Sequence, residues 1–357
     1  MRKSNLPTKN QTLRVLIVRL GAMGDILHAL PAVTALRAAH PEWFLGWAVE
    51  PQWRGLLAAN GATERGPSMP LADKIHLVPA KQWGRNPLSG STIRDIRRVR
   101  RDLRAEHYDI CVDLQGAVRS AVLGRWSHPQ RLIGEAKPRE WAAQYLFDET
   151  VNTRGVHVIE QAIEVVCAIA QEELPLVPPR LPRSEDAERK YSSVRRPFAI
   201  LNPGAGWGAK RWPAERYGAV ARALADKGLF VVINAGPGEE ELAEEVKRSS
   251  IAKAIVLSPS VEELIALTRD ASLMIAGDTG PLHLASALGV PVVGIYGPTD
   301  PARNGPFGGR FRVLRNPQSK RDHSRRAEPE AGLLTISVEE VVQAAEELLK
   351  ETGKDVC

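Results

Sequence analysis

The chain has 357 residues, of which 43% are hydrophobic, and its formal net charge is +6. The length favours two domains of ordinary size, and the hydrophobic share suffices for real cores. No apolar run approaches the length of a membrane span, which excludes a chain that crosses a bilayer. Residues 1–13 carry Lys and Arg without the apolar core of a signal peptide, so we expect a cytoplasmic protein. The three cysteines, Cys111, Cys167 and Cys357, lack metal-ligand spacing, and we expect them to be reduced.

The positive charge is concentrated in the first half of the chain. Residues 1–175 contain 23 Lys and Arg against 18 Asp and Glu, a net charge of +5, whereas residues 176–357 contain 25 against 24, a net charge of +1. The excess is densest between Lys81 and Arg104, with eight basic and two acidic residues. It predicts an anionic partner: nucleic acid, a membrane surface or a charged substrate. No nucleic-acid motif or aromatic platform accompanies it, so we expect no nucleic acid.

Short apolar runs alternate with helical runs along the first half of the chain. Helices are predicted over Ile26–Ala39 and Ile93–Glu106. Strands are predicted at five places: Arg14–Val18, Leu45–Val49, Ile75–Val78, Ile110–Asp113 and Leu132–Gly134. The proline-rich stretch Leu174–Pro182 is typical of a linker between domains.

A second series of alternating elements follows the linker. The predicted strands are Phe198–Leu201, Leu229–Asn234, Ala254–Leu257, Leu273–Ala276 and Val290–Tyr296. The predicted helices are Ala214–Asp226, Glu239–Ser249, Val261–Arg269 and a final amphipathic helix, Val338–Lys350, with a polar loop at Asn316–Ala331. Strands separated by helices of this length imply parallel sheets with right-handed crossovers. The sequence therefore predicts two doubly wound α/β domains that face a cleft.

The strongest local motif is Asp278-Thr279-Gly280-Pro281-Leu282-His283, between two predicted strands. It predicts a tight turn and a helix start at the carboxyl end of a sheet. There, free backbone N–H groups and the positive end of the helix dipole favour an anion such as phosphate. The alternative is a helix cap with a packed histidine.

A second turn follows the first predicted strand and leads to Asp25. Asp25 either caps the next helix or acts as a general base held rigidly at a strand-to-helix turn, and the residues alone leave both open. His28, one helical turn later, is another candidate base, although a core or surface histidine is the simpler interpretation.

Two further motifs follow strands of the second predicted domain. Lys210 lies in a glycine-containing turn at residues 204–213 and can neutralise a phosphate, although spacing alone favours a solvated loop lysine. Glu239 follows Gly236 and Gly238 and is placed to accept bonds from ribose hydroxyls, although a helix-start glutamate is the simpler interpretation. In the first domain, Lys81 and Arg85 lie in a predicted loop and are candidates for binding an anionic substrate.

These motifs together resemble glycosyltransferase family 9, the bacterial ADP-heptose heptosyltransferases of lipopolysaccharide core assembly, and are closest to heptosyltransferase I. The resemblance covers nearly the whole chain. It rests on five segments: Arg14–Val18 with Met23-Gly24-Asp25, Asp113-Leu114-Gln115-Gly116, Lys210-Arg211-Trp212-Pro213, Asp278-Thr279-Gly280 with His283, and Gly297-Pro298-Thr299-Asp300-Pro301.

The resemblance implies a GT-B fold of two Rossmann-like domains. Residues 1–175 would bind the acceptor, residues 176–336 would bind the nucleotide-sugar donor, and residues 337–357 would form a helix that crosses back to the first domain. By the family's pattern, Asp25 is the catalytic base, Lys210 holds the donor phosphates and Glu239 contacts ribose. Asp278, Thr279, Gly280 and His283 match the donor-binding turn, and Lys81, Arg85 and Arg119 are our candidates for binding the acceptor.

The implied reaction is an inverting transfer of L-glycero-D-manno-heptose from ADP-heptose. The acceptor would be 3-deoxy-manno-octulosonic acid (Kdo) on lipid A, whose carboxylates and phosphates fit the basic first half. No metal or other cofactor is expected, and the protein would rest peripherally on the cytoplasmic side of the inner membrane. Other family members that use another acceptor or sugar, including second-heptose and protein heptosyltransferases, remain alternatives. So do a non-transferring nucleotide-sugar-binding protein and a sugar epimerase.

Overall fold

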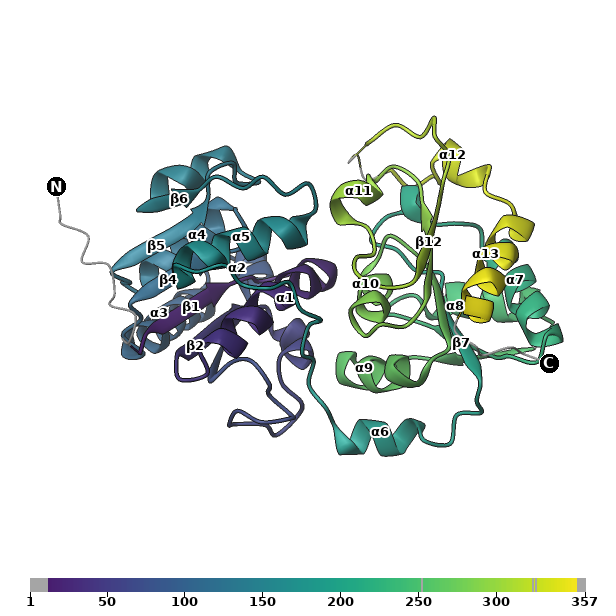
Figure 1. The fold of residues 1–357 in the computed structure, drawn as a ribbon, viewed down its shortest axis with the longest axis horizontal. Coiled ribbons are helices and arrows are strands. Elements are labelled where there is room, and N and C mark those ends of the chain that lie inside the picture. The colour runs from purple at the N-terminus through teal and green to yellow at the C-terminus, as the bar shows by residue number, and fades with distance from the viewer. Residues whose placement is uncertain (1–11, 252, 323, 325, 352–357) are drawn as a thin grey trace. The chain divides into compact units, whose positions relative to one another are not determined.

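The computed structural model describes residues 12–251, 253–322, 324 and 326–351. The predictions for residues 1–11 and for Cys357 lie outside the described residues. The chain divides into two compact units (Figure 1). The first comprises residues up to Gly21, 29–155 and 159–180, and the second comprises 22–28, 156–158 and the residues from Leu181 onward. The break at Arg180–Leu181 falls within the proline-rich stretch of residues 174–182.

The first unit contains a six-stranded parallel sheet in the order β3-β2-β1-β4-β5-β6. Its strands are β1 (Arg14–Val18), β2 (Phe44–Val49), β3 (Lys74–Leu77), β4 (Ile110–Asp113), β5 (Arg131–Glu135) and β6 (Glu149–Val151). Its helices are α1 (Met23–Ala39), whose first residues group with the second unit, η1 (Pro51–Leu56), α2 (Ala80–Arg85), α3 (Gly90–Ala105), α4 (Val118–Trp126), η2 (Trp141–Leu146) and α5 (Val158–Ala170). The chain builds the sheet outward from β1, first through β2 to β3 on one side and then from β4 to β6 on the other, so the direction reverses between β1 and β4.

The second unit repeats this architecture in the order β12-β11-β10-β7-β8-β9. Its strands are β7 (Phe198–Asn202), β8 (Phe230–Asn234), β9 (Ala254–Leu257), β10 (Leu273–Gly277), β11 (Val292–Tyr296) and β12 (Phe311–Arg315). Its helices are α6 (Glu185–Tyr191), η3 (Gly208–Lys210), α7 (Ala214–Asp226), α8 (Glu240–Ser249), α9 (Val261–Asp270), α10 (Gly280–Ala287), α11 (Pro301–Asn304), α12 (Ala331–Leu334) and α13 (Val338–Glu351). The predicted doubly wound α/β fold is confirmed in both units. In such sheets, ligands bind outside the carboxyl ends of the strands at the switch point, which here lies between β7 and β10.

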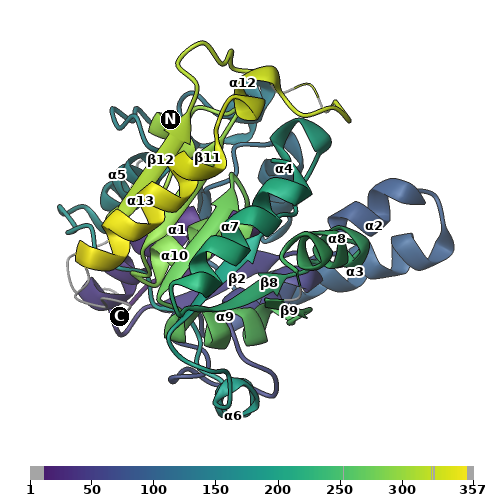
Figure 2. The same cartoon turned by 90° about the vertical axis from the view of Figure 1, so that its right-hand side faces the viewer.

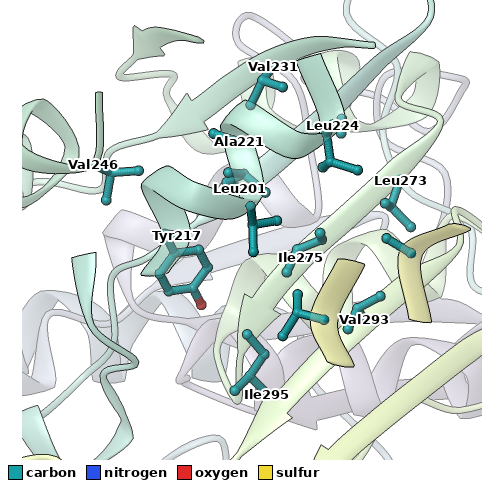
Figure 3. Close-up of a cluster of buried hydrophobic side chains, with 14 of the residues drawn as sticks. Leu201, Tyr217, Ala221, Leu224, Val231, Val246, Leu273, Ile275, Val293 and Ile295 are labelled. Atoms are coloured by element: carbon teal, nitrogen blue, oxygen red, sulfur yellow. The ribbon is translucent and has the colours of Figure 1, made fainter. Parts of the chain in front are cut away.

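The core of the second unit forms because alternate residues of each buried strand point to opposite faces. Leu201 of β7 packs with Tyr217 of α7 on one face (Figure 3), whereas its neighbour Ile200 joins the cluster on the other. Both faces are covered by helices, so the strands are apolar throughout rather than alternating.

The final helix belongs to the second unit. Helix α13 packs there against α7, β11 and β12 (Figure 2). Its apolar residues are buried in the same core: Val341, Ala344, Ala345, Leu348 and Leu349. This stripe at helical spacing holds the helix in place, since it covers a sheet face that would otherwise be exposed. Among the described residues, no helix is both long and apolar enough to span a membrane.

Candidate functional site

The loops after β7 and β10 meet at the switch point of the second unit. Lys210 ends η3 in the first loop, and Asp278 directly follows β10 in the second. The ammonium of Lys210 forms an ion pair with the Asp278 carboxylate, and both side chains are only about a tenth exposed. Lys210 also lies over the ring of Trp207, 4.2 Å from its centroid. Lys210 is therefore a fixed, nearly buried cation and not a solvated loop lysine.

Asp278 joins Lys210 to His283. One carboxylate oxygen pairs with Lys210, and the other accepts a bond from Nε2 of His283 at 3.1 Å. Burial alone would raise the pKa of Asp278, but the hydrogen bond from His283 and the charges of His283 and Lys210 outweigh burial and hold that pKa well below its usual value. The group is thus a carboxylate at neutral pH. Because a carboxylate repels phosphate, its physical role is to orient its two donors.

Helix α10 begins at this cluster. Thr279 is its N-cap residue and Pro281 lies in its first turn, where a missing N–H costs nothing. The Thr279 hydroxyl accepts a long bond, 3.4 Å, from Nδ2 of Asn202, and Oδ1 of Asn202 accepts a bond from Asn234 at 2.6 Å. Both asparagines end strands and are buried. This network ties the ends of β7 and β8 to the helix start, where backbone N–H groups favour an anion.

Glu239 lies over the same edge of the sheet. It is the N-cap residue of α8 and accepts a bond from the Gly236 N–H at 3.1 Å. A Cβ atom on Gly204 would lie 2.0–2.1 Å from the carboxylate of Glu239, so a larger residue there would displace that carboxylate. Burial is the largest influence on Glu239 and raises the pKa of its carboxyl group. Glu239, which the family's pattern predicts to contact ribose, follows β8, and β8 neighbours β7, whose end begins the loop of Lys210.

Asp25 lies in the first turn of α1, within the segment 22–28 that groups with the second unit. Its carboxylate accepts a bond from the Ala22 N–H at 3.0 Å, which is half of a capping box. A Cβ on the adjacent Gly24 would lie 2.9 Å from Cδ2 of His283. Asp25 therefore does cap its helix, and its neighbour Gly24 lies against His283 at one end of the cluster.

The first unit carries its own buried carboxylate, Asp113, at the end of β4. Oδ1 of Asp113 accepts bonds from the N–H groups of Gln115 (2.8 Å) and Gly116 (2.9 Å), and Oδ2 accepts one from the Ser120 hydroxyl (2.7 Å). Gly116 has a φ of 65°, which glycine adopts without strain. Burial raises the pKa of Asp113 to about 6 despite these bonds. In the segment Asp113-Leu114-Gln115-Gly116, the aspartate therefore stabilises the turn that follows β4.

The three predicted acceptor residues lie on helices of the first unit. Lys81 and Arg85 are exposed on α2, which corrects the prediction of a loop there. A six-residue helix between Pro79 and Pro87 has no apolar period to reveal it. The Lys81 N–H donates to the Glu50 carboxylate, which follows β2, at 2.9 Å. Arg119 is exposed in the first turn of α4.

The sequence did not identify several residues that shape the site. Asn202 and Asn234 are among them, and nothing in a single sequence indicates that two strand ends share a bond. Gly204 is another, because the sequence does not show that the Glu239 carboxylate lies beside it. Among the described residues, no group of three or more His, Cys, Asp or Glu side chains is placed to hold a metal ion.

The chain is similar to known glycosyltransferases over most of its length. It is 28% identical over 316 residues to lipopolysaccharide heptosyltransferase 1 of Escherichia coli K12, covering 86% of this chain and 94% of that protein. Lipopolysaccharide heptosyltransferase 2 of the same strain is 24% identical, with 85% and 88% covered. Solved structures of the E. coli heptosyltransferase WaaC, with ADP and with ADP-2-deoxy-2-fluoro heptose, superpose with TM-scores of 0.78 and 0.76 at 26% identity. Each covers 94% of this chain, and 100% and 99% of those chains.

The family model agrees with these relatives and with the two doubly wound units described above. The model described as glycosyltransferase family 9 (heptosyltransferase) matches residues 96–333, about two thirds of the chain and most of the elements that carry the site. The chain belongs to glycosyltransferase family 9, the heptosyltransferases.

Proposed function

We propose that this protein transfers L-glycero-D-manno-heptose from ADP-heptose to the Kdo of the lipopolysaccharide inner core. The observation that carries the proposal is the cluster of Lys210, Asp278 and His283 at the start of α10, with the first turn of α1 beside it. That cluster offers a cation, an oriented imidazole and a helix N-terminus at one switch point. We infer the sugar, the nucleotide and the lipopolysaccharide acceptor from the heptosyltransferases to which this chain is similar.

The donor would be held by residues of the second unit. Lys210 and the backbone at Thr279–Gly280 would face the diphosphate, with Asp278 and His283 setting the direction of Lys210. Glu239, accepting from hydroxyl groups, would contact ribose. As ADP leaves, negative charge grows on its terminal phosphate, and a fixed cation with aligned amide dipoles stabilises that charge. These groups supply the charge compensation without a metal.

Asp25 would act as the general base in a single, inverting displacement. The carboxylate removes the proton of an acceptor hydroxyl while that oxygen attacks the anomeric carbon, and the bond to ADP breaks on the opposite face. Lys81, Arg85 and Arg119 would bind the carboxylates and phosphates of the acceptor, which has its lipid in the inner membrane. We therefore place the protein at the cytoplasmic surface of that membrane, without insertion.

The base assignment is tested with Asp25→Asn, because Asn keeps an oxygen for the Ala22 N–H and thus the helix cap. We expect unchanged ADP binding by calorimetry and unchanged thermal stability, with transfer slowed by about 10²–10⁴-fold. Full turnover in this variant would remove Asp25 from the base role.

The donor assignment is tested with Lys210→Ala and its charge-preserving counterpart Lys210→Arg. We expect the alanine variant to raise the donor KM and the dissociation constant of ADP, and the arginine variant to recover part of both. If Lys210→Ala leaves the donor saturation curve unshifted, the diphosphate binds elsewhere.

A further inference from the structure

His28 connects the turn of Asp25 to the donor cluster. It follows Asp25 by three residues, one helical turn along α1, and is 7% exposed. Its Nε2 atom lies 3.2 Å from Nδ1 of His283, and the two ring centroids are 4.4 Å apart. His283 in turn reaches Asp278 with its other ring nitrogen, Nε2, at 3.1 Å. The side chains form a continuous line from His28 through His283 and Asp278 to Lys210.

The protons along this line follow from the ionised Asp278. An ionised carboxylate can only accept hydrogen bonds. Nε2 of His283 must therefore carry a hydrogen and donate a hydrogen bond to Asp278. In the hydrogen bond between Nδ1 of His283 and Nε2 of His28, one of the two nitrogens then carries the hydrogen and the other accepts it. With a neutral His283 ring, His28 donates; with a charged ring, His28 accepts. In both cases His28 is the partner that satisfies the second nitrogen of a buried ring.

Close approach of the two helix starts makes this contact possible. Gly24, four residues before His28 and on the same helical face, leaves room for the His283 ring, since a Cβ would lie 2.9 Å from Cδ2. Gly280 at the start of α10 likewise leaves room for Met23, since a Cβ there would lie 2.6 Å from its sulfur. Two glycines thus let the turn that carries Asp25 lie directly against the turn that carries His283.

A second histidine, His157, packs against His28. The rings of His28 and His157 are in edge-to-face contact, 5.4 Å between centroids. The Nε2 atom of His157 donates to the Gly305 carbonyl oxygen at 3.1 Å, and its ring packs on Phe307. His28 is therefore held by ring packing against His157 and by a hydrogen bond to His283, and the two contributions can be separated by substitution.

We propose that His28 is a positioning residue of the donor site. Its hydrogen bond to His283 fixes that ring, and through it Asp278 and Lys210, in the arrangement that receives the donor diphosphate. The same bond fixes the turn of Asp25 against this arrangement. The role rests on the proposed function, because it assigns His28 to the donor and base geometry of that reaction.

Two substitutions separate the hydrogen bond from the packing. His28→Gln keeps an amide that can donate to or accept from His283, but loses the ring that packs on His157. His28→Phe keeps a ring at that place but cannot form the hydrogen bond. Removing the partner of a buried polar atom corresponds to a change of about 5- to 150-fold. We expect His28→Phe to raise the dissociation constant of ADP and the donor KM within that range, and His28→Gln to stay within about threefold of the wild type.

A spectroscopic measurement makes the test independent of transfer. In protein labelled with ¹⁵N-histidine, the ring nitrogens of His283, assigned from a His283→Gln variant, should keep their shifts in His28→Gln and change in His28→Phe. If His28→Phe preserves both the His283 signals and ADP binding, or if His28→Gln disrupts them while His28→Phe does not, His28 acts only by packing and the proposal fails. Absence of heptose transfer by the wild-type protein would instead refute the proposed function, and the His283 signals would still decide the role of His28.

Discussion

Replacing Asp113 by Asn should stabilise the protein in a manner that depends on pH. Asp113 is fully buried, and its pKa rises from 3.8 to about 6. The folded state therefore binds an extra proton between these two values. A raised carboxyl pKa means that stability is greatest at low pH and falls as the pH rises through this window. Above pH 6, the charged carboxylate lowers the free energy of unfolding by about 3 kcal/mol relative to a group with an unshifted pKa. This value corresponds to a shift of about two pKa units at about 1.4 kcal/mol each.

The surrounding hydrogen bonds tolerate an amide. The Asn oxygen can accept from the N–H groups of Gln115 and Gly116, as Oδ1 of Asp113 does now. Its nitrogen can donate to Ser120, whose hydroxyl already lies 2.8 Å from the Ala117 carbonyl oxygen and can donate there instead. The substitution therefore removes the charge and leaves each polar atom with a partner.

The assay is urea unfolding at pH 5 and pH 8, followed by tryptophan fluorescence. Six of the eight tryptophans lie in the first unit with Asp113: Trp43, Trp47, Trp53, Trp83, Trp126 and Trp141. The stability difference between Asp113→Asn and wild type should grow by about 1.4 kcal/mol from pH 5 to pH 8, because about one unit of the pKa window lies above pH 5. Asp322→Asn is the control: the pKa of Asp322 is lowered to about 2, so its difference should stay constant. A constant or shrinking difference for Asp113→Asn would refute the reasoning.

Three further predictions concern the site. Gly204→Ala places a Cβ within 2.1 Å of the Glu239 carboxylate and should raise the donor KM by about 5- to 150-fold in saturation kinetics; an unshifted curve would show that Glu239 is not needed there. Gly24→Ala places a Cβ 2.9 Å from His283 and should slow transfer while thermal melting shows an intact fold, and normal turnover would contradict the close approach. Gly206→Ala, with open space around its Cβ, is the control for both. EDTA should leave the rate of transfer unchanged, and a loss restored by added divalent metal would overturn the metal-independent mechanism.

Much of the fold could be predicted because buried parallel strands are continuous apolar runs. The strand Ile110–Asp113 was predicted with the bounds that the structure has. Strands β6 and β12 were not predicted, because both lie at sheet edges and β6 has only three residues. In β12, Arg312 and Arg315 interrupt the apolar pattern.

The site could be predicted only where its parts are close in sequence. Asp278 and His283 were placed together because a helix start joins them. The pairing of Lys210 with Asp278 spans 68 residues, and that of His28 with His283 spans 255. Such contacts depend on which strand ends meet at the switch point, and a single sequence carries no signal of them. The same limit explains why Lys210 looked like a loop residue and His28 like an ordinary core histidine.

The central claim is tested most directly by a transfer assay with defined acceptors. Purified protein receives ADP-L-glycero-D-manno-heptose with either deacylated Kdo2-lipid A or the same acceptor already carrying one heptose, and products are weighed by mass spectrometry. We predict that the first acceptor gains the mass of one heptose with release of one ADP, and that the second gains none. A gain only on the second acceptor would assign the protein to second-heptose transfer. No gain on either acceptor, with ADP-heptose bound, would contradict the proposed transfer to the lipopolysaccharide inner core.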